Sequence, residues 1–166
     1  MTDHELTFDT FFKRELVFLD ADWDSAAALF QNVADVLERK NYVAPTFRLA
    51  LAERESNYPT GLQTPTIGAA IPHADPVHIR RPFIAVIRPS RPIHFAQMGG
   101  DPNGEQVAAS LIFMLGVMRN GMQVQVLQRL MELLADQPLV QKLMDSKRED
   151  DLLSVISRGF AAESRI

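Results

Sequence analysis

An uninterrupted apolar run limits the folds that this chain can adopt. The segment VAASLIFMLGVM, residues 107–118, contains no charged side chain. A run of this kind is typical of a strand that is buried on both faces, in a sheet covered by helices. It is shorter than the roughly 18 apolar residues that a bilayer-spanning helix needs. The segment therefore predicts a layered domain with this strand inside it.

Four further segments predict strands beside it. They are ELVFLD at residues 15–20, TIGAAI at 66–71, FIAVIRPS at 83–90 and, more weakly, RPIHFAQM at 91–98. Two stretches rich in turn-forming residues, 56–66 and 99–105, predict loops.

Helical periodicity occupies most of the remainder. Apolar residues from Ala26 to Leu37 recur at i, i+4, i+7 and i+11, which predicts a helix with Asp22 or Asp24 as its N-cap. A second helix is predicted over residues 45–55. Three more are predicted from Gly121 to about 135, over 136–146 and over 148–160, where Gly159 is a candidate C-terminal cap.

Together these elements predict one α/β domain. The 166 residues are enough for a single domain with a full core. We expect a single-domain three-layer sandwich, in which a mixed central β-sheet is flanked by helices on both faces. The domain is expected to span residues 1–166, with its core at about 15–160.

Composition excludes several classes of function. The net charge is -4, which argues against a nucleic-acid partner. There is no cysteine, so these residues form no disulfide, thiolate metal site or cysteine nucleophile. The N-terminal stretch MTDHELTFDTFFKREL lacks the basic and apolar regions of a signal peptide. We therefore expect a cytoplasmic protein.

The segment TIGAAIPHADPVH, residues 66–78, places one histidine between two prolines. Pro72 and Pro76 each restrict the residue before them to extended conformations. His73 is therefore held just past a predicted strand end, a usual position for ligand sites in α/β sheets. Histidine can act there as a general base, a metal ligand or a nucleophile.

Arg54 and Thr60 are candidate donors to an anion beside His73. Arg54 continues the apolar face of the second helix, and a guanidinium group suits phosphate geometry. Ordinary structural roles stay open. His73 can be a hydrogen-bonded loop residue, Arg54 can pair with Glu55 or Asp75, and Thr60 can be a turn former.

A metal site is a further open interpretation of the same segment. His73, Asp75 and His78 form an H-x-D-x-x-H pattern, whose side chains are all possible metal ligands. The spacing is not a specific signal for any metal. It therefore remains an alternative to the anion site.

The segment AERESNYPTGLQTPTIGAAIPHAD resembles the active-site region of the enzyme IIA domains of the bacterial sugar phosphotransferase system (PTS), fructose/mannitol type. Arg54-Glu55, Thr60-Gly61 and Ile71-Pro72-His73 match the family motifs in order. The resemblance covers about residues 15–160. The runs at 71–78 and 94–100 are most similar to stand-alone galactitol-type proteins.

The resemblance implies a mannitol-type IIA fold and a phosphoryl relay. His73 would accept a phosphoryl group from the phosphohistidine of the carrier HPr and pass it to a cysteine of a separate enzyme IIB. Arg54 would support the phosphoryl group, and Thr60 would belong to the site loop. No metal or organic cofactor is implied. The membrane component IIC would select the sugar and would meet this protein only indirectly.

One position departs from the mannitol-type pattern. Those members carry a second histidine where this chain has Gln123, which can donate a hydrogen bond but carries no charge. Whether His78 or His94 compensates stays open. Two alternatives to transport also stay open: a nitrogen-type regulatory IIA protein, and a metal- or ligand-binding module that uses His73, Asp75 and His78.

Overall fold

The apolar run forms the longest strand of a mixed sheet. In the computed structural model, which describes residues 7–163, β6 extends over Gln106–Gly116 and its residues from Leu111 to Leu115 are fully buried. β6 pairs antiparallel with β4 along one edge and parallel with β3 along the other. The predicted domain also includes residues 1–6 and 164–166, which lie outside the described residues.

Five other strands complete the sheet. They are β1 (Val17–Ala21), β2 (Gly61–Gln63), β3 (Gly68–Ala70), β4 (Phe83–Pro89) and β5 (Ile93–Ala96). The strand order is β1-β4-β6-β3-β2, and β5 pairs antiparallel with the first part of β6. β2 lies inside the segment that was predicted to be a loop, so that prediction is wrong.

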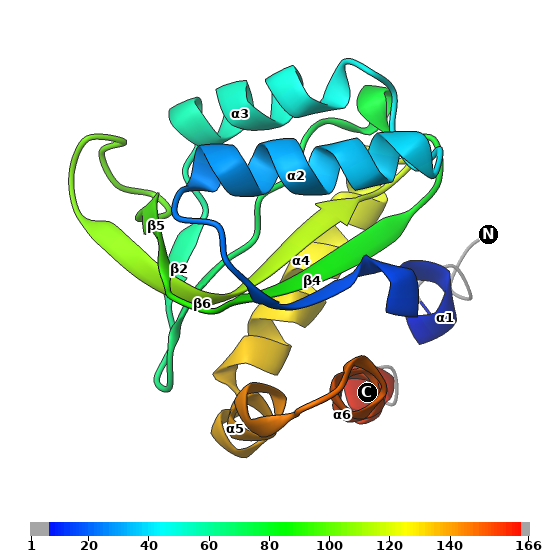
Figure 1. Cartoon of the computed structure of the whole chain (residues 1–166), viewed down its shortest axis with the longest axis vertical. Coiled ribbons are helices and arrows are strands. Elements are labelled where there is room, and N and C mark those ends of the chain that lie inside the picture. Colours follow the sequence, from blue (N-terminus) through cyan, green and yellow to red (C-terminus); the bar gives the residue numbers. More distant parts are fainter. Residues whose placement is uncertain (1–6, 164–166) are drawn as a thin grey trace.

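Helices cover both faces of the sheet (Figure 1). One layer consists of α2 (Ala26–Arg39) and α3 (Phe47–Asn57), and the other of α4 (Asn120–Ala135), α5 (Gln137–Asp145) and α6 (Glu149–Glu163). The short α1 (Phe8–Phe11) lies near α6, and two 3-10 turns, η2 (Arg14–Leu16) and η3 (Pro76–His78), precede β1 and follow β3.

β6 contributes side chains to two separate cores. Leu111, Phe113 and Leu115 pack in the core beneath α4, α5 and α6. Ile112 and Met114 pack in the core beneath α2 and α3. This alternation follows from the two-residue period of a strand. The predicted three-layer sandwich is confirmed.

Two predicted helix ends are wrong. The N-cap of α2 is Ser25, whose hydroxyl accepts the Ala28 N–H at 3.1 Å, rather than Asp22 or Asp24. α6 continues through Gly159 to Glu163, and Gly159 packs closely against α5. A Cβ there would lie 2.5 Å from the Leu139 side chain, which explains the glycine without any C-terminal cap.

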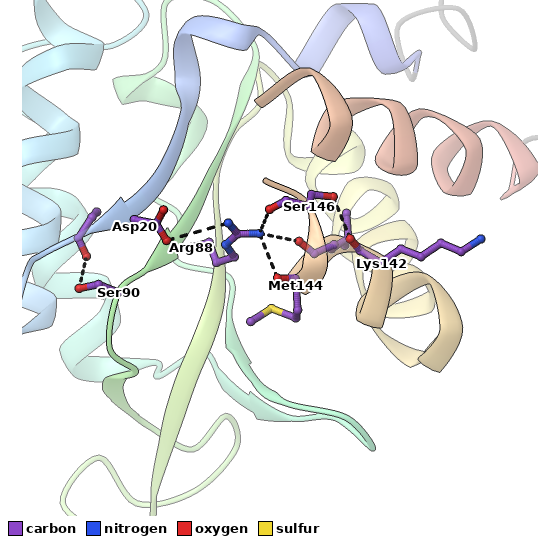
Figure 2. Close-up of polar contacts among 8 residues, drawn as sticks. Asp20, Arg88, Ser90, Lys142, Met144 and Ser146 are labelled. Atoms are coloured by element: carbon purple, nitrogen blue, oxygen red, sulfur yellow. Dashed lines mark hydrogen bonds and ion pairs between the residues drawn. The ribbon is translucent and has the colours of Figure 1, made fainter. Parts of the chain in front are cut away.

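A buried arginine joins α5 to the sheet. Arg88 lies on β4, and its Nη1 donates to the carbonyl oxygens of Leu143, Met144 and Ser146 at 2.9, 3.2 and 2.6 Å (Figure 2). Its Nη2 lies 4.0 Å from Asp20 Oδ1. Arg88 therefore satisfies the carbonyl groups that the end of a helix leaves without partners. Within residues 7–163, no helix has the length and apolar content needed to cross a membrane.

Candidate functional site

His73 lies at the end of β3, where the chain is held against β6. β3 ends at Ala70, and the Leu115 N–H of β6 donates to the Pro72 carbonyl at 3.2 Å. His73 itself lies beside Leu115 in an isolated parallel bridge. Because β3 and β6 are parallel, His73 and the turn that follows β6 lie at the same edge of the sheet.

The imidazole ring of His73 is held in one tautomer. Its Nδ1 lies 2.8 Å from the Ile71 carbonyl oxygen, and the His73 residue is only 6% exposed. A carbonyl oxygen can only accept, so Nδ1 carries the proton. Nε2 has no hydrogen-bond partner among the described residues. The neutral ring therefore presents its lone pair at Nε2.

The surroundings keep this ring neutral. Burial lowers the pKa of His73 below its ordinary value of 6.5, and the nearby Arg54 charge lowers the pKa further. The Ile71 carbonyl and the Asp75 carboxylate act in the opposite direction and raise it. The net lowering favours a nucleophilic imidazole at neutral pH.

Arg54 projects from α3 beside this ring. Its Nη1 donates to Asp75 Oδ1 at 3.0 Å, so the pairing that the sequence left open is present. Its guanidinium carbon lies 5.7 Å from the centre of the Tyr58 ring. Its Nε is buried and has no acceptor among residues 7–163. Arg54 therefore brings positive charge and one unused donor to the neighbourhood of His73.

Thr60 is buried and connects α3 to the histidine segment. Its hydroxyl donates to Glu55 Oε1 at 2.9 Å and accepts the Ile71 N–H at 3.2 Å. Its own N–H donates to Glu55 Oε2 at 2.8 Å. From the sequence, Glu55 was only part of the Arg54-Glu55 motif and a possible ion-pair partner of Arg54. The Arg-Glu pair was visible, but the partial burial of this carboxyl group depends on the return of the chain at Thr60.

The remaining candidates, Gln123 and His78, lie on two other elements. Gln123, in the first turn of α4, is 9% exposed, and its Oε1 is buried with no partner in the described part of the chain. α4 begins four residues after β6 ends, so its N-terminus lies at the same edge of the sheet as His73. His78 follows in η3, where its Nδ1 lies 2.8 Å from the Thr46 hydroxyl.

His94 is not part of this site. It lies on β5 opposite Ala108, seven residues along β6 from Leu115, the neighbour of His73. At about 3.3 Å per strand residue, the two histidines are separated by roughly 20 Å. His94 therefore cannot compensate for the missing second histidine.

The same segment does not assemble a metal centre. His73 Nδ1, Asp75 and His78 Nδ1 bind Ile71, Arg54 and Thr46, respectively. Across residues 7–163, no group of three or more His, Asp or Glu side chains lies close enough together to hold a metal ion. The geometry favours an anion site with an imidazole nucleophile.

Known solved structures share this fold. The complex of mannitol enzyme IIA with phosphorylated enzyme IIB from Escherichia coli matches with a TM-score of 0.70 and 20% identity, over 88% of this chain and 98% of that one. The nitrogen regulatory protein IIA-Ntr from Neisseria meningitidis matches with a TM-score of 0.70 and 24% identity, over 90% of this chain and 97% of that one. At these identities the likeness establishes the fold alone.

Comparisons of sequence identify the family. The galactitol-specific EIIA component of Escherichia coli (strain K12) is 30% identical over 113 residues, which are 68% of this chain and 73% of that protein. The model of the family "Phosphoenolpyruvate-dependent sugar phosphotransferase system, EIIA 2" matches residues 10–159. The chain therefore belongs to this EIIA family, and it is a phosphotransferase that transfers phosphoryl groups through a histidine.

Proposed function

We propose that His73 carries the phosphoryl group and passes it between two proteins in the cytoplasm. The observation that supports this role most directly is the 2.8 Å hydrogen bond from Nδ1 to Ile71, which leaves Nε2 as the nucleophile. Nε2 forms a bond to phosphorus while the bond from phosphorus to the histidine of HPr breaks. The proton stays on Nδ1, where the Ile71 carbonyl stabilises the positive charge that the ring gains.

The second transfer delivers the group to a cysteine of enzyme IIB. A thiolate attacks phosphorus, and Nε2 of His73 leaves with its electron pair. These 166 residues contain no cysteine, so the acceptor lies outside them. The structural match to a mannitol IIA protein in complex with phosphorylated IIB supports IIB as the acceptor. The galactitol-specific relative supports uptake of galactitol or a similar polyol.

Arg54 and Gln123 are proposed to stabilise the phosphoryl oxygens. Arg54 Nε is a buried donor without an acceptor among residues 7–163, and the guanidinium already affects His73 electrostatically. Gln123 lies in the first turn of α4, where helix N–H groups favour an anion. The Thr60 hydroxyl donates to Glu55, so we assign it an indirect role. His78 is a further candidate for supporting the phosphoryl group. Its observed contact is with Thr46, which gives no direct evidence for that role.

Exposed apolar side chains near this edge of the sheet suit transient docking of protein partners. Val77, four residues after His73, is 81% exposed, and Leu49 on α3 is 67% exposed. Met118 and Val124, which flank the start of α4, are 48% and 65% exposed. A site that must meet two proteins in turn needs an accessible and partly apolar rim.

Incubation with phosphorylated HPr tests this function. We expect one phosphoryl group per chain, on Nε2 of His73, and subsequent transfer to a galactitol-type IIB. His73→Ala is expected to take up none, while His94→Ala, which changes an exposed residue outside the site, retains uptake. A phosphoryl group on any other residue, or none on the wild-type protein, would refute the proposal.

A regulatory role is a second candidate, because the chain matches a nitrogen regulatory IIA protein as well as the mannitol protein. In that case His73 would still be phosphorylated, but the group would control binding to other proteins. Rapid transfer from phosphorylated protein to a galactitol-type IIB favours transport. A stable phosphorylated form that does not react with this IIB favours regulation.

A further inference from the structure

We infer that Glu55 is a positioning residue for the phosphoryl transfer: its carboxylate, acting through Thr60 and the Ile71 backbone, holds His73 with Nε2 free to react. This inference rests on the proposed role of His73. Glu55 belongs to α3, 18 positions before the histidine in the sequence, and has no assigned role.

The register of the β2–β3 hairpin brings Thr60 to the histidine segment. Gly61 pairs with Ala70 in the antiparallel ladder, so Thr60 and Ile71 are the next opposed positions. Ile71 lies just beyond β3, and its N–H donates to the Thr60 hydroxyl at 3.2 Å. Its carbonyl accepts His73 Nδ1–H at 2.8 Å. Thr60 therefore holds the N–H of Ile71, and the carbonyl of Ile71 orients the imidazole of His73.

The Thr60 hydroxyl has a fixed direction only when Glu55 is ionised. Since the Ile71 N–H must donate, Thr60 Oγ1 accepts this bond and donates its own proton to Glu55 Oε1 at 2.9 Å. Glu55 Oε2 already accepts the Thr60 N–H at 2.8 Å. A proton on Glu55 would therefore occupy Oε1 and displace the hydroxyl proton. When Glu55 is a carboxylate, each of these donors has an acceptor. When Glu55 is protonated, the Thr60 hydroxyl proton loses its acceptor.

Glu55 acts on His73 through these hydrogen bonds rather than through its charge. The charges that shift the pKa of His73 are those of Arg54 and Asp75. Arg54, on the same helix, is also the charged group that acts on Glu55, and it lowers the pKa of that carboxyl group. Thr60, from the start of the hairpin, supplies both hydrogen bonds to it. A change in the protonation of Glu55 therefore reaches His73 by way of Thr60 and Ile71.

Glu55 also titrates in the range where the protein would work. Burial raises its pKa to about 7, while the two Thr60 hydrogen bonds and Arg54 lower it in part. The pKa of His73 lies below 6.5 because the ring is buried. As pH falls, Glu55 is therefore protonated before His73. The effect of Glu55 protonation on the transfer rate can then be separated from the effect of His73 protonation.

Glu55→Gln imitates the neutral side chain at every pH. Its amide oxygen can accept the Thr60 N–H, but its NH₂ group donates toward the Thr60 hydroxyl, as the protonated acid does. We expect phosphoryl uptake from phosphorylated HPr at pH 8 to be about tenfold slower than in the wild type. The ratio of wild-type to variant rate should approach one as pH falls to 6. Taking this ratio at each pH cancels the pH dependence of the donor.

Two further variants separate positioning from general damage. Glu55→Asp keeps a carboxylate and is expected to recover part of the rate at pH 8. Glu53→Gln removes the same charge from an exposed residue of α3 and should match the wild type at every pH. Thermal melting of each variant by circular dichroism reports whether it is folded.

The outcomes distinguish the inference from the proposed function. If the wild type acquires no phosphoryl group on His73, the proposed function fails. If the wild type is phosphorylated there and Glu55→Gln gives the same rate and pH profile, only the inference fails. Should Glu55→Gln be unfolded, nitrogen NMR of His73 in the wild type decides. Loss of the Nδ1–H···O bond on titration through about pH 7 supports the inference, and an unchanged ring overturns it.

Discussion

At the scale of single residues, Arg54 combines an observed ion pair with a donor that is proposed to act on the phosphoryl group. Its ion pair with Asp75 is solvent-accessible, since the Asp75 side chain is 65% exposed, and such pairs contribute about 1 kcal/mol or less to stability. Its buried Nε has no acceptor in the described residues. The two parts of one side chain can therefore be tested independently.

We expect Arg54→Ala to slow phosphoryl uptake at least tenfold, because it removes both the charge and the Nε donor from the phosphoryl group. The midpoint of urea unfolding should change little. Asp75→Asn is the matched control, as it breaks the ion pair but keeps the guanidinium, and should retain most of the rate. Quenched-reaction assays with phosphorylated HPr measure the uptake rate of both variants. An unchanged rate in Arg54→Ala would remove this residue from the mechanism.

Gln123, in the helix layer opposite α3, allows a similar test of a proposed phosphoryl contact. Its amide lies in the first turn of α4, and its Oε1, an acceptor, is buried and unpaired among residues 7–163. The hydrogen bond to a phosphoryl oxygen would come from its NH₂ group. We expect Gln123→Ala to slow phosphoryl uptake about three- to tenfold, the loss typical of one hydrogen bond of about 1 kcal/mol. Gln125→Ala changes an exposed glutamine of the same helix and should have no effect. Equal rates for the two variants would contradict a role for Gln123.

The candidate site was only partly predictable from the sequence, and particular residues show why. His73 was found because its two neighbouring prolines are a local signal, and the motif order linked Arg54 and Thr60 to it. Glu55 was visible only as part of the Arg54-Glu55 motif, and its burial was not predicted, since an acid near a helix end is usually exposed. Its environment arises only when Thr60 folds back onto α3.

At the scale of elements, segments with an apolar pattern of their own were predictable, including the short β3 within residues 66–71, and β2 was not. β6 was evident because the strand is apolar on both faces, and α2 because its apolar residues follow a helical period. β2 has three residues, and its strand conformation depends on pairing with β3. Nothing within GLQ identifies a strand, so this element required the tertiary structure.

Arg88 shows how one side chain fixes an element. Its Nη1 contacts three carbonyl oxygens around the end of α5, and these groups have few other donors in a buried position (Figure 2). We expect Arg88→Met to lower the free energy of unfolding by about 2–3 kcal/mol, as for hydrogen bonds to a charged group. Urea denaturation measures this change.

The control for Arg88 is Arg91→Met. Arg91 is 69% exposed and pairs with an exposed Asp22, so its loss should change the free energy of unfolding by less than about 1 kcal/mol. Phosphoryl uptake by folded Arg88→Met should remain near the wild-type rate, because Arg88 anchors α5 rather than the histidine segment. Equal stability of the two variants would refute the anchoring role of Arg88.

At the scale of the whole molecule, the site lies where the two helix layers approach one edge of the sheet. α3 supplies Arg54 and Glu55 from one layer, and α4 supplies Gln123 from the other. β3 carries the chain to His73 between them. If His73 carries the phosphoryl group as proposed, this layered arrangement would support it from both sides and leave its Nε2 available to partners.

This arrangement predicts a conflict between stability and activity at Glu55. The pKa of its carboxyl group is raised from 4.5 to about 7 in the folded protein, so folding favours the protonated form. The resulting stabilisation is present in full below about pH 4.5 and is lost as pH rises toward 7, by at most about 3 kcal/mol. The lowered pKa of His73 acts in the opposite direction, since that contribution is lost as pH falls below about 6.5.

Comparison of the wild type with Glu55→Gln isolates the first contribution, because both proteins keep His73. We expect the variant to become more stable relative to the wild type as pH rises from 5 to 8, by up to about 3 kcal/mol. Urea unfolding at several pH values measures this difference. Over the same range its relative transfer rate should decrease, because the ionised carboxylate that lowers stability is the form that holds Thr60. A stability difference that does not vary with pH would show that the pKa of Glu55 is not raised, and the conflict would then not exist.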